Sequence, residues 1–295
     1  MIRRPPRSTH CISSAASDVY KRQDLIHWND LPYAIYPNPE EACFSGATFV
    51  EEDRVIAMYH GTKAGNMIAV SDDDLLLNWK KINNNNPVIK IENEDGSPLP
   101  YRVFDPCIWR KGEYYYSLSG GTLPHKPSGR RTRANFLFKS KDLVSWDYLH
   151  PFIEGDSFTR IGDDGACPYF WPIGEDRYIL YFFSHMSGGQ ALLGDYDKKR
   201  DKFLVTSHHE FNFGAAHPGG VHAPSATTYL NGKNILIFNM NNSKDTYRWN
   251  QLMTLPREIG IAGEDGINKD VLTIKPAGDI AVSYTHLTLP TICSV

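Results

Sequence analysis

The chain has 295 residues, 41% of them hydrophobic, and a formal net charge of −3. These values are typical of a globular protein with one large domain or two ordinary ones. The charge excludes the basic surface of a nucleic-acid-binding protein. The longest apolar run, Tyr178 to Phe183, is far shorter than the roughly 20 residues of a membrane-spanning helix. We therefore expect a soluble protein with neither nucleic acid nor a membrane as its partner.

The two ends of the chain differ in character from its middle. Residues 1–23 are rich in Arg and Ser and contain no apolar stretch of the kind that a secretory signal needs. We interpret residues 1–23 and 282–295 as non-native segments, because both resemble translated adapter sequence. Residues 24–281 then hold the native fold, which we expect to be a fragment of a longer protein. The three cysteines of this part lack CxxC spacing, which predicts free thiols.

Four stretches of the middle part repeat one order of features. Each has a Gly or Pro marker, a short apolar strand, a polar turn and a second, more hydrophobic strand. The markers follow one another at intervals of 60, 62 and 56 residues, at Gly46, Pro106, Pro168 and Pro224. A second marker of the type D-L-x-x-W interleaves with the first, at Asp24–Trp28, Asp74–Trp79 and Asp142–Trp146. A repeat of this length with few convincing helices predicts an all-β fold, a β-propeller.

Asp105 stands directly before one of the markers, Pro106. In a propeller the first strand of every blade lines the central channel, so residues at these strand starts gather at one end of it. Proline is tolerated at such a start because no ladder donor is needed there. Asp105 is therefore a candidate for a site in the channel mouth. The alternative is a turn-capping aspartate, for which Asp-Pro is a common setting.

Several segments together resemble glycoside hydrolase family 32, the invertases, levanases and inulinases. "DLIHWNDLPYAIYPNPEEACFSGATFV" is similar to a D-L-x-x-W-x-x-L-P stretch that runs into the family's F-S-G motif, here Phe44, Ser45 and Gly46. "VFDPCIW" matches the R-D-P motif, "ACPYFWPIG" the E-C-P motif, and Trp249 to Glu258 the W-x-x-x-x-x-L-P-R-E segment. The resemblance implies a five-bladed propeller, here with an incomplete first blade and without the usual C-terminal β-sandwich.

The resemblance also implies an activity, the hydrolysis of terminal β-fructosyl linkages of sucrose or fructans by a retaining double displacement. That reaction needs a carboxylate nucleophile and a carboxylic acid roughly 5–5.5 Å away. Asp105 matches the family's third carboxylate, which stabilises the transition state. By position, Phe44, Ser45, Phe104 and Cys167 are expected to contact the carbohydrate substrate. His222, just before another strand start, is a further candidate for a sugar hydroxyl.

The chain departs from the family pattern at three points. The N-D-P-x-G motif that holds the nucleophile is absent, so we expect this fragment to be inactive. Ala166 stands at the acidic position of E-C-P, and Phe104 replaces the arginine of R-D-P. Asp164 precedes Ala166 by two residues, so in an extended strand it faces the same side at roughly 6.6 Å and is a candidate substitute acid. The alternative is that Asp164 belongs to a plain turn.

Two other functions therefore stay open. One is a glycosidase of another specificity, because Phe104 and Ala166 change the pocket, and the other is a sugar-binding propeller without catalysis. The basic loop Ser128–Arg133 is a solvated loop or a contact for an acidic or phosphorylated sugar. We expect no cofactor and no metal, because the following histidines lack metal-ligand spacing: His185, His208, His209, His217 and His222.

Overall fold

The computed structural model describes residues 31–125, 128–155, 157–174, 176–211, 219–228, 233–242, 251–263 and 268–277. The expected non-native ends, the D-L-x-x-W copy at Asp24–Trp28, Trp249 and His217 lie outside these residues. The regular elements of the described part are strands and one short 3₁₀ turn, Asn83–Asn85. Among these residues no helix has the length and apolarity needed to cross a membrane.

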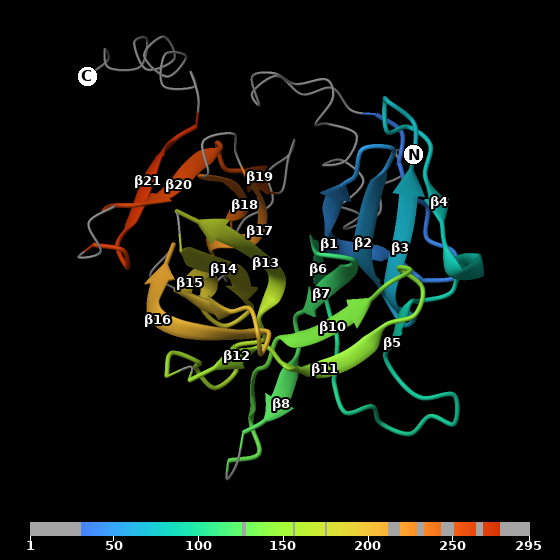
Figure 1. Ribbon diagram of the computed structural model, residues 1–295, viewed down its shortest axis with the longest axis horizontal. Coiled ribbons are helices and arrows are strands. Elements are labelled where there is room, and N and C mark those ends of the chain that lie inside the picture. Colours follow the sequence, from blue (N-terminus) through green and yellow to red (C-terminus); the bar gives the residue numbers. More distant parts are fainter. Residues whose placement is uncertain are drawn as a thin grey trace.

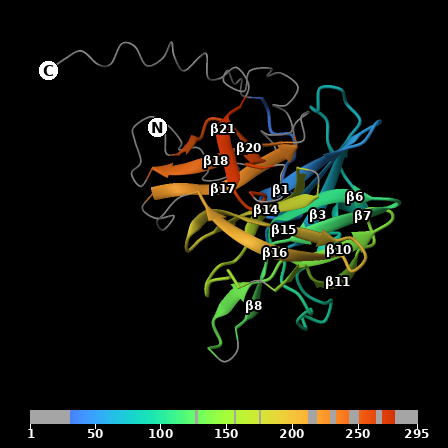
Figure 2. The ribbon, with the colours of Figure 1, turned by 60° about the vertical axis from the view of Figure 1, so that its left-hand side comes forward.

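Apart from one small hairpin, the strands form four sheets, and in each the four main strands are antiparallel neighbours that follow one another in chain order (Figures 1 and 2). The first sheet contains β1 (Cys43–Val50), β2 (Val55–Gly61), β3 (Gly65–Ser71) and β4 (Lys80–Lys81), with β5 (Ile89–Lys90) also paired to β3. The second contains β6 (Pro106–Lys111), β7 (Tyr114–Ser119), β10 (Phe136–Ser140) and β11 (Asp147–Pro151). A small separate hairpin pairs β8 (Thr122–Pro124) with β9 (Arg131–Arg133).

The third sheet contains β13 (Ala166–Ile173), β14 (Arg177–Ser184), β15 (Gly188–Asp197) and β16 (Lys202–Glu210). The short strand β12 (Ile153–Glu154) lies parallel to β16 at its edge. The fourth sheet contains β17 (Gly219–Thr228), β18 (Asn234–Asn242), β20 (Arg257–Ile261) and β21 (Leu272–Pro276), with β19 (Leu252–Met253) paired to β18.

The four sheets are arranged like the blades of a propeller, with their first strands innermost. β1 contacts β6, β6 contacts β13, and β13 contacts β17. Each Gly or Pro marker of the sequence repeat lies in one of these first strands. The prediction of an all-β, propeller-like fold is therefore confirmed, with four blades described.

The second sequence marker is a turn that links the third strand of a blade to its fourth. In both described copies the residue three positions before the tryptophan is left-handed, with φ of 53° at Leu76 and 68° at Leu143. Its carbonyl accepts the indole N–H, over 2.8 Å from Trp79 and 2.9 Å from Trp146. The Asp142 carboxylate accepts the N–H groups of the two residues before Trp146. In the other copy the accepting carboxylate is that of Asp73, one residue before the motif, so the feature common to both copies is the indole bond that closes the turn.

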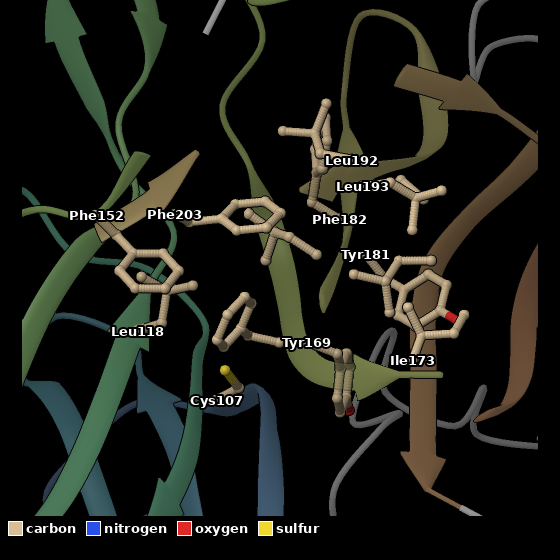
Figure 3. Close-up of a cluster of buried hydrophobic side chains, with 14 of the residues drawn as sticks. Cys107, Leu118, Phe152, Tyr169, Ile173, Tyr181, Phe182, Leu192, Leu193 and Phe203 are labelled. Atoms are coloured by element: carbon tan, nitrogen blue, oxygen red, sulfur yellow. The ribbon is translucent and has the colours of Figure 1, made fainter. Parts of the chain in front are cut away.

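The largest buried cluster has most of its residues in the second and third blades (Figure 3) and also includes Ala47 of the first and Leu236, Phe238 and Ile259 of the fourth. Phe152 has no exposed surface, and its ring centroid lies 4.8 Å from that of Phe170 and 6.0 Å from that of Phe203. Interleaved aromatic rings of this kind exclude water and fix the two sheets against each other. As a result, β6 and β13 lie side by side, and so do the residues at their starts.

Candidate functional site

Three of the four innermost strands carry an irregularity at the same point. The pairing register shifts between Cys43 and Gly46 in β1, between Ala166 and Tyr169 in β13, and between His222 and Ser225 in β17. In the last two strands a residue inside the shift has a positive φ, 48° at Cys167 and 50° at Ala223. Such bulges turn side chains away from the regular alternation of a strand. The F-S-G and A-C-P segments thus each contain a β-bulge near the start of an innermost strand.

Two glycines at the end of β7 bring the site segments together. Gly120 exchanges backbone hydrogen bonds with the 104–105 segment, and the Gly121 N–H donates to the Asp164 carbonyl over 3.2 Å. A Cβ on Gly120 would lie 2.6 Å from the Gly165 carbonyl oxygen, and one on Gly121 only 1.9 Å from that of Arg102. Only glycine permits this approach, which joins the residues before β6 to those before β13.

Asp105 lies buried at the mouth of β6, with 8% of its surface exposed. Its Oδ2 atom accepts the backbone N–H of Cys167 over 2.9 Å and faces the Cys167 thiol at 3.3 Å. This contact joins Asp105 and Cys167, both of which the sequence analysis expected to lie at the sugar. The left-handed backbone of Cys167 is part of the bulge in β13, at the point where its N–H meets this carboxylate.

Burial is the main influence on the ionisation of Asp105. Loss of water raises the pKa of this carboxyl, and the hydrogen bonds from Cys167 and the charge of His60 act in the opposite direction. The negative charge of Asp164 raises the pKa further. Two carboxylates therefore interact across this mouth, as expected for a site that handles protons or hydroxyl groups.

Asp164 lies two residues before the start of β13 and is paired with a residue that the sequence analysis did not assign to the site. Its Oδ2 atom lies 2.6 Å from Nδ1 of His185, in the turn between β14 and β15. The His185 side chain is 69% exposed, whereas that of Asp164 is 19% exposed. The hydrogen bond between the imidazole and the Asp164 carboxylate raises the pKa of His185. Asp164 is thus a charge partner at the strand mouth and not only a turn residue.

Ala166 is buried, 4% exposed, and packs with Cys167, Phe183 and Ala223. The Phe183 ring contacts two imidazoles, that of His185 at 4.8 Å and that of the predicted sugar contact His222 at 5.1 Å between centroids.

Phe104 lies edge-on to the ring of His60 at 6.4 Å, with the guanidinium of Arg102 5.9 Å from its centroid. Phe44, which is 45% exposed, and Ser45 lie within the bulge of β1, which contacts both β6 and β13. The predicted residues therefore come from strand mouths that adjoin one another.

His60 is a second residue that sequence reasoning missed. It lies near the end of β2, and its Nδ1 atom is 3.0 Å from Oδ1 of Asn66. In a hairpin the end of the second strand lies beside the start of the first. Residues at the end of a second strand are therefore also candidates for the site. His60 stands at such a position in β2, and His185 follows β14 directly. No group of three or more His, Cys, Asp or Glu side chains in the described ranges is arranged to hold a metal ion.

The family described as "Glycosyl hydrolases family 32 N-terminal domain" matches residues 18–276. The chain belongs to glycosyl hydrolase family 32. Among curated relatives in the family, the sucrose-6-phosphate hydrolases of Zymomonas mobilis and Bacillus subtilis are each 25% identical to it. The alignments cover 86% and 87% of this chain, and 52% and 56% of those proteins. The chain thus spans about half the length of these relatives.

Solved structures of family 32 proteins share the fold. The GH32 β-fructofuranosidase of Bombyx mori superposes with a TM-score of 0.66 at 22% identity, covering 88% of this chain and 55% of that one. The sucrose-6-phosphate hydrolase of Lactobacillus gasseri superposes with a TM-score of 0.61 at 18% identity, covering 86% and 53%. At these identities the likeness supports the propeller-like fold of the family 32 domain.

Proposed function

We propose that the mouth around Asp105 and Asp164 binds a terminal β-fructosyl group, and that the site serves retaining hydrolysis of sucrose- or fructan-type linkages. Membership of family 32 supports this, as do curated relatives named as sucrose-6-phosphate hydrolases. The observation that carries the proposal is the buried carboxylate of Asp105, held by Cys167 where three segments converge. Carboxylates are seldom buried unless hydrogen-bond donors replace the lost water. A sugar hydroxyl is a suitable further donor to this carboxylate.

Asp105 is assigned the role of transition-state stabiliser. Both hydrogen bonds from Cys167 are directed to Oδ2, so we assign Oδ1 to fructosyl hydroxyl groups. Hydrogen bonds to a charged acceptor that tighten as positive charge develops on the sugar ring accelerate the reaction. Phe44, Ser45 and His222 are proposed as further sugar contacts around it.

A double displacement also needs an acid and a nucleophile, and the chain supplies these two roles only in part. Ala166 has no proton to transfer, and Asp164, two residues before it, is the nearest carboxylate in the sequence, so we propose that Asp164 takes part in replacing the acid. The 295 residues contain no Asn-Asp-Pro, the family's nucleophile motif. We therefore infer that this chain binds the sugar but does not complete the displacement unaided. Residues 24–281 are proposed as one propeller domain, five-bladed in its complete form, with 1–23 and 282–295 non-native.

A binding experiment tests this proposal on the chain as it is. Isothermal titration with sucrose and with short inulin oligomers should show saturable binding, and Asp105→Asn should weaken it by about tenfold or more, one charge-assisted hydrogen bond. Asp73→Asn, at an exposed turn, is the matched control and should bind like the parent. Equal binding by the parent and Asp105→Asn would place the sugar elsewhere. No binding by the parent would end the fructosyl proposal.

Ala166 specifically favours a second candidate, a sugar-binding propeller without catalysis. Azide can replace a missing carboxylate nucleophile, so cleavage of sucrose in azide reports on the rest of the site. A large gain in azide-dependent cleavage in Ala166→Glu would favour a fructosidase that has lost its acid. No gain, with sucrose binding retained, would favour the binding module.

A further inference from the structure

The strand pairing beside Ala166 creates a pair of groups that proton transfer requires. Ala166 pairs with Phe183 across β13 and β14. Asp164 lies two residues before Ala166, and His185 lies two residues after Phe183. If the antiparallel pairing is extended beyond the strand ends, Asp164 and His185 are therefore opposite each other. The side chains meet there, with 2.6 Å between Asp164 Oδ2 and His185 Nδ1. The position that lost its own acid is therefore adjacent to an imidazole–carboxylate pair.

Resting on the proposed fructosyl function, we propose that His185 protonates the leaving group in this site and that Asp164 positions it. With the ring proton on Nδ1, Oδ2 of Asp164 accepts it, and Oδ1 lies 3.4 Å from the His185 backbone N–H, so Asp164 acts as an acceptor here. A carboxylate oxygen that accepts the ring N–H does not donate a proton in the same arrangement. His185 is the more exposed partner and keeps Nε2 on the side of the ring away from Asp164.

The electrostatic setting suits this role. The charged groups that act on His185 are Asp164, before β13, and Asp105, before β6, and both raise the pKa of the imidazole. Partial burial opposes them. A raised pKa keeps the ring protonated closer to neutral pH, which a proton donor needs before each turnover. The Phe183 ring packs against the imidazole of His185, with 4.8 Å between the ring centroids.

The atoms and electrons of the proposed step balance, and the nucleophile is the only further reactant that it needs. As the bond between the anomeric carbon and the glycosidic oxygen breaks, its electron pair stays on the oxygen, which takes the proton from Nε2. The leaving sugar departs as a neutral alcohol, and the anomeric carbon forms its new bond to the nucleophile. The neutral imidazole regains a proton from water. Asp164 holds Nδ1–H throughout and so fixes the tautomer, the function of a positioning carboxylate.

The test compares two leaving groups with azide as the nucleophile supplied to the chain. Sucrose expels an alcohol that needs protonation, whereas p-nitrophenyl β-fructofuranoside expels a phenolate that does not. His185→Ala should lose about 100-fold or more in rate on sucrose and less than about fivefold on the aryl fructoside. His150→Ala is the control, since that imidazole contacts the Pro151 and Arg200 carbonyls instead. Because His185 is exposed, its removal should leave the melting temperature unchanged.

Asp164→Asn gives an independent readout. Activity on sucrose should fall as pH rises through the pKa of the imidazole, and this alkaline limb should move to lower pH once the carboxylate charge is gone. Equal losses on both substrates in His185→Ala, or no loss on sucrose, would overturn the proton-donor role while leaving the fructosyl function intact. If the parent cleaves neither substrate in azide, the catalytic function fails, and this proposal fails with it.

Discussion

Phe152 joins the second and third blades, and its truncation should weaken the fold and the site together. The residue is fully buried between β11 and β12. Its ring lies within 6.2 Å of four other aromatic rings, those of Trp109, Phe170, Tyr196 and Phe203. Its backbone also bridges the blades, because its N–H donates to Asn135 and its carbonyl accepts from Phe203. Phe152→Ala removes the ring and leaves those backbone bonds in place.

The expected loss follows from the buried area. A buried aromatic side chain removes about 150–250 Å² from water, which at about 25 cal/mol per Å² corresponds to roughly 4–6 kcal/mol. The β-carbon is retained and the neighbouring rings relax in part, and measured truncations of this kind cost about 3–5 kcal/mol. We therefore expect Phe152→Ala to lower the free energy of unfolding by about 4 kcal/mol. At roughly 2–4 °C per kcal/mol, the melting temperature should fall by about 8–16 °C.

Urea unfolding followed by tryptophan fluorescence, with a thermal melt beside it, measures this change. Tyr36→Ala is the matched control, because Tyr36 is 63% exposed and should change the free energy by less than about 0.5 kcal/mol. In a double-mutant cycle, Phe152 and Phe203 should show a coupling of at least about 0.5 kcal/mol, since their rings are stacked. A loss below about 1.5 kcal/mol in Phe152→Ala would mean that the two blades are not held together by this cluster.

Three further predictions concern the site and the buried thiols. Burial raises the pKa of Asp105 above its unfolded value of 3.8, so the folded state binds this proton more tightly. Protonated Asp105 therefore contributes its full stability at pH values below the pKa of the unfolded state. This stability is lost as the pH rises through the pKa of the folded state. Asp105→Asn should therefore be more stable than the parent near neutral pH, with the difference vanishing in acid, in urea titrations at several pH values. Gly121→Ala should cost at least about 2 kcal/mol in a thermal melt and should abolish sucrose binding, because its Cβ would overlap the Arg102 carbonyl; normal binding would contradict the close approach. Burial raises the pKa of Cys107 to about 12, so at about pH 8 only roughly one thiol in ten thousand is ionised. Peptide mapping should find Cys107 unlabelled by iodoacetamide in the folded chain and labelled in urea, and rapid labelling of the folded chain would contradict its burial.

The sequence alone determined the features that depend on neighbouring residues. Strands and turns follow from local alternation and from Gly, Pro and Asp at turn positions, so the all-β class, the repeat and the strand starts were predictable. The D-L-x-x-W turn is local in the same sense, because its hydrogen bonds close within a few residues. The position of Asp105 at a strand mouth and the alanine at position 166 were also evident from the repeat and the motif order.

The tertiary structure decided which side chains meet. His185 appeared in the sequence only as one of several scattered histidines, and its contact with Asp164 depends on the register of β13 and β14. The hydrogen bond from Cys167 to Asp105 joins two blades and requires a left-handed backbone at Cys167. Strand register and blade packing are set by contacts between residues far apart in the chain, which no local pattern encodes.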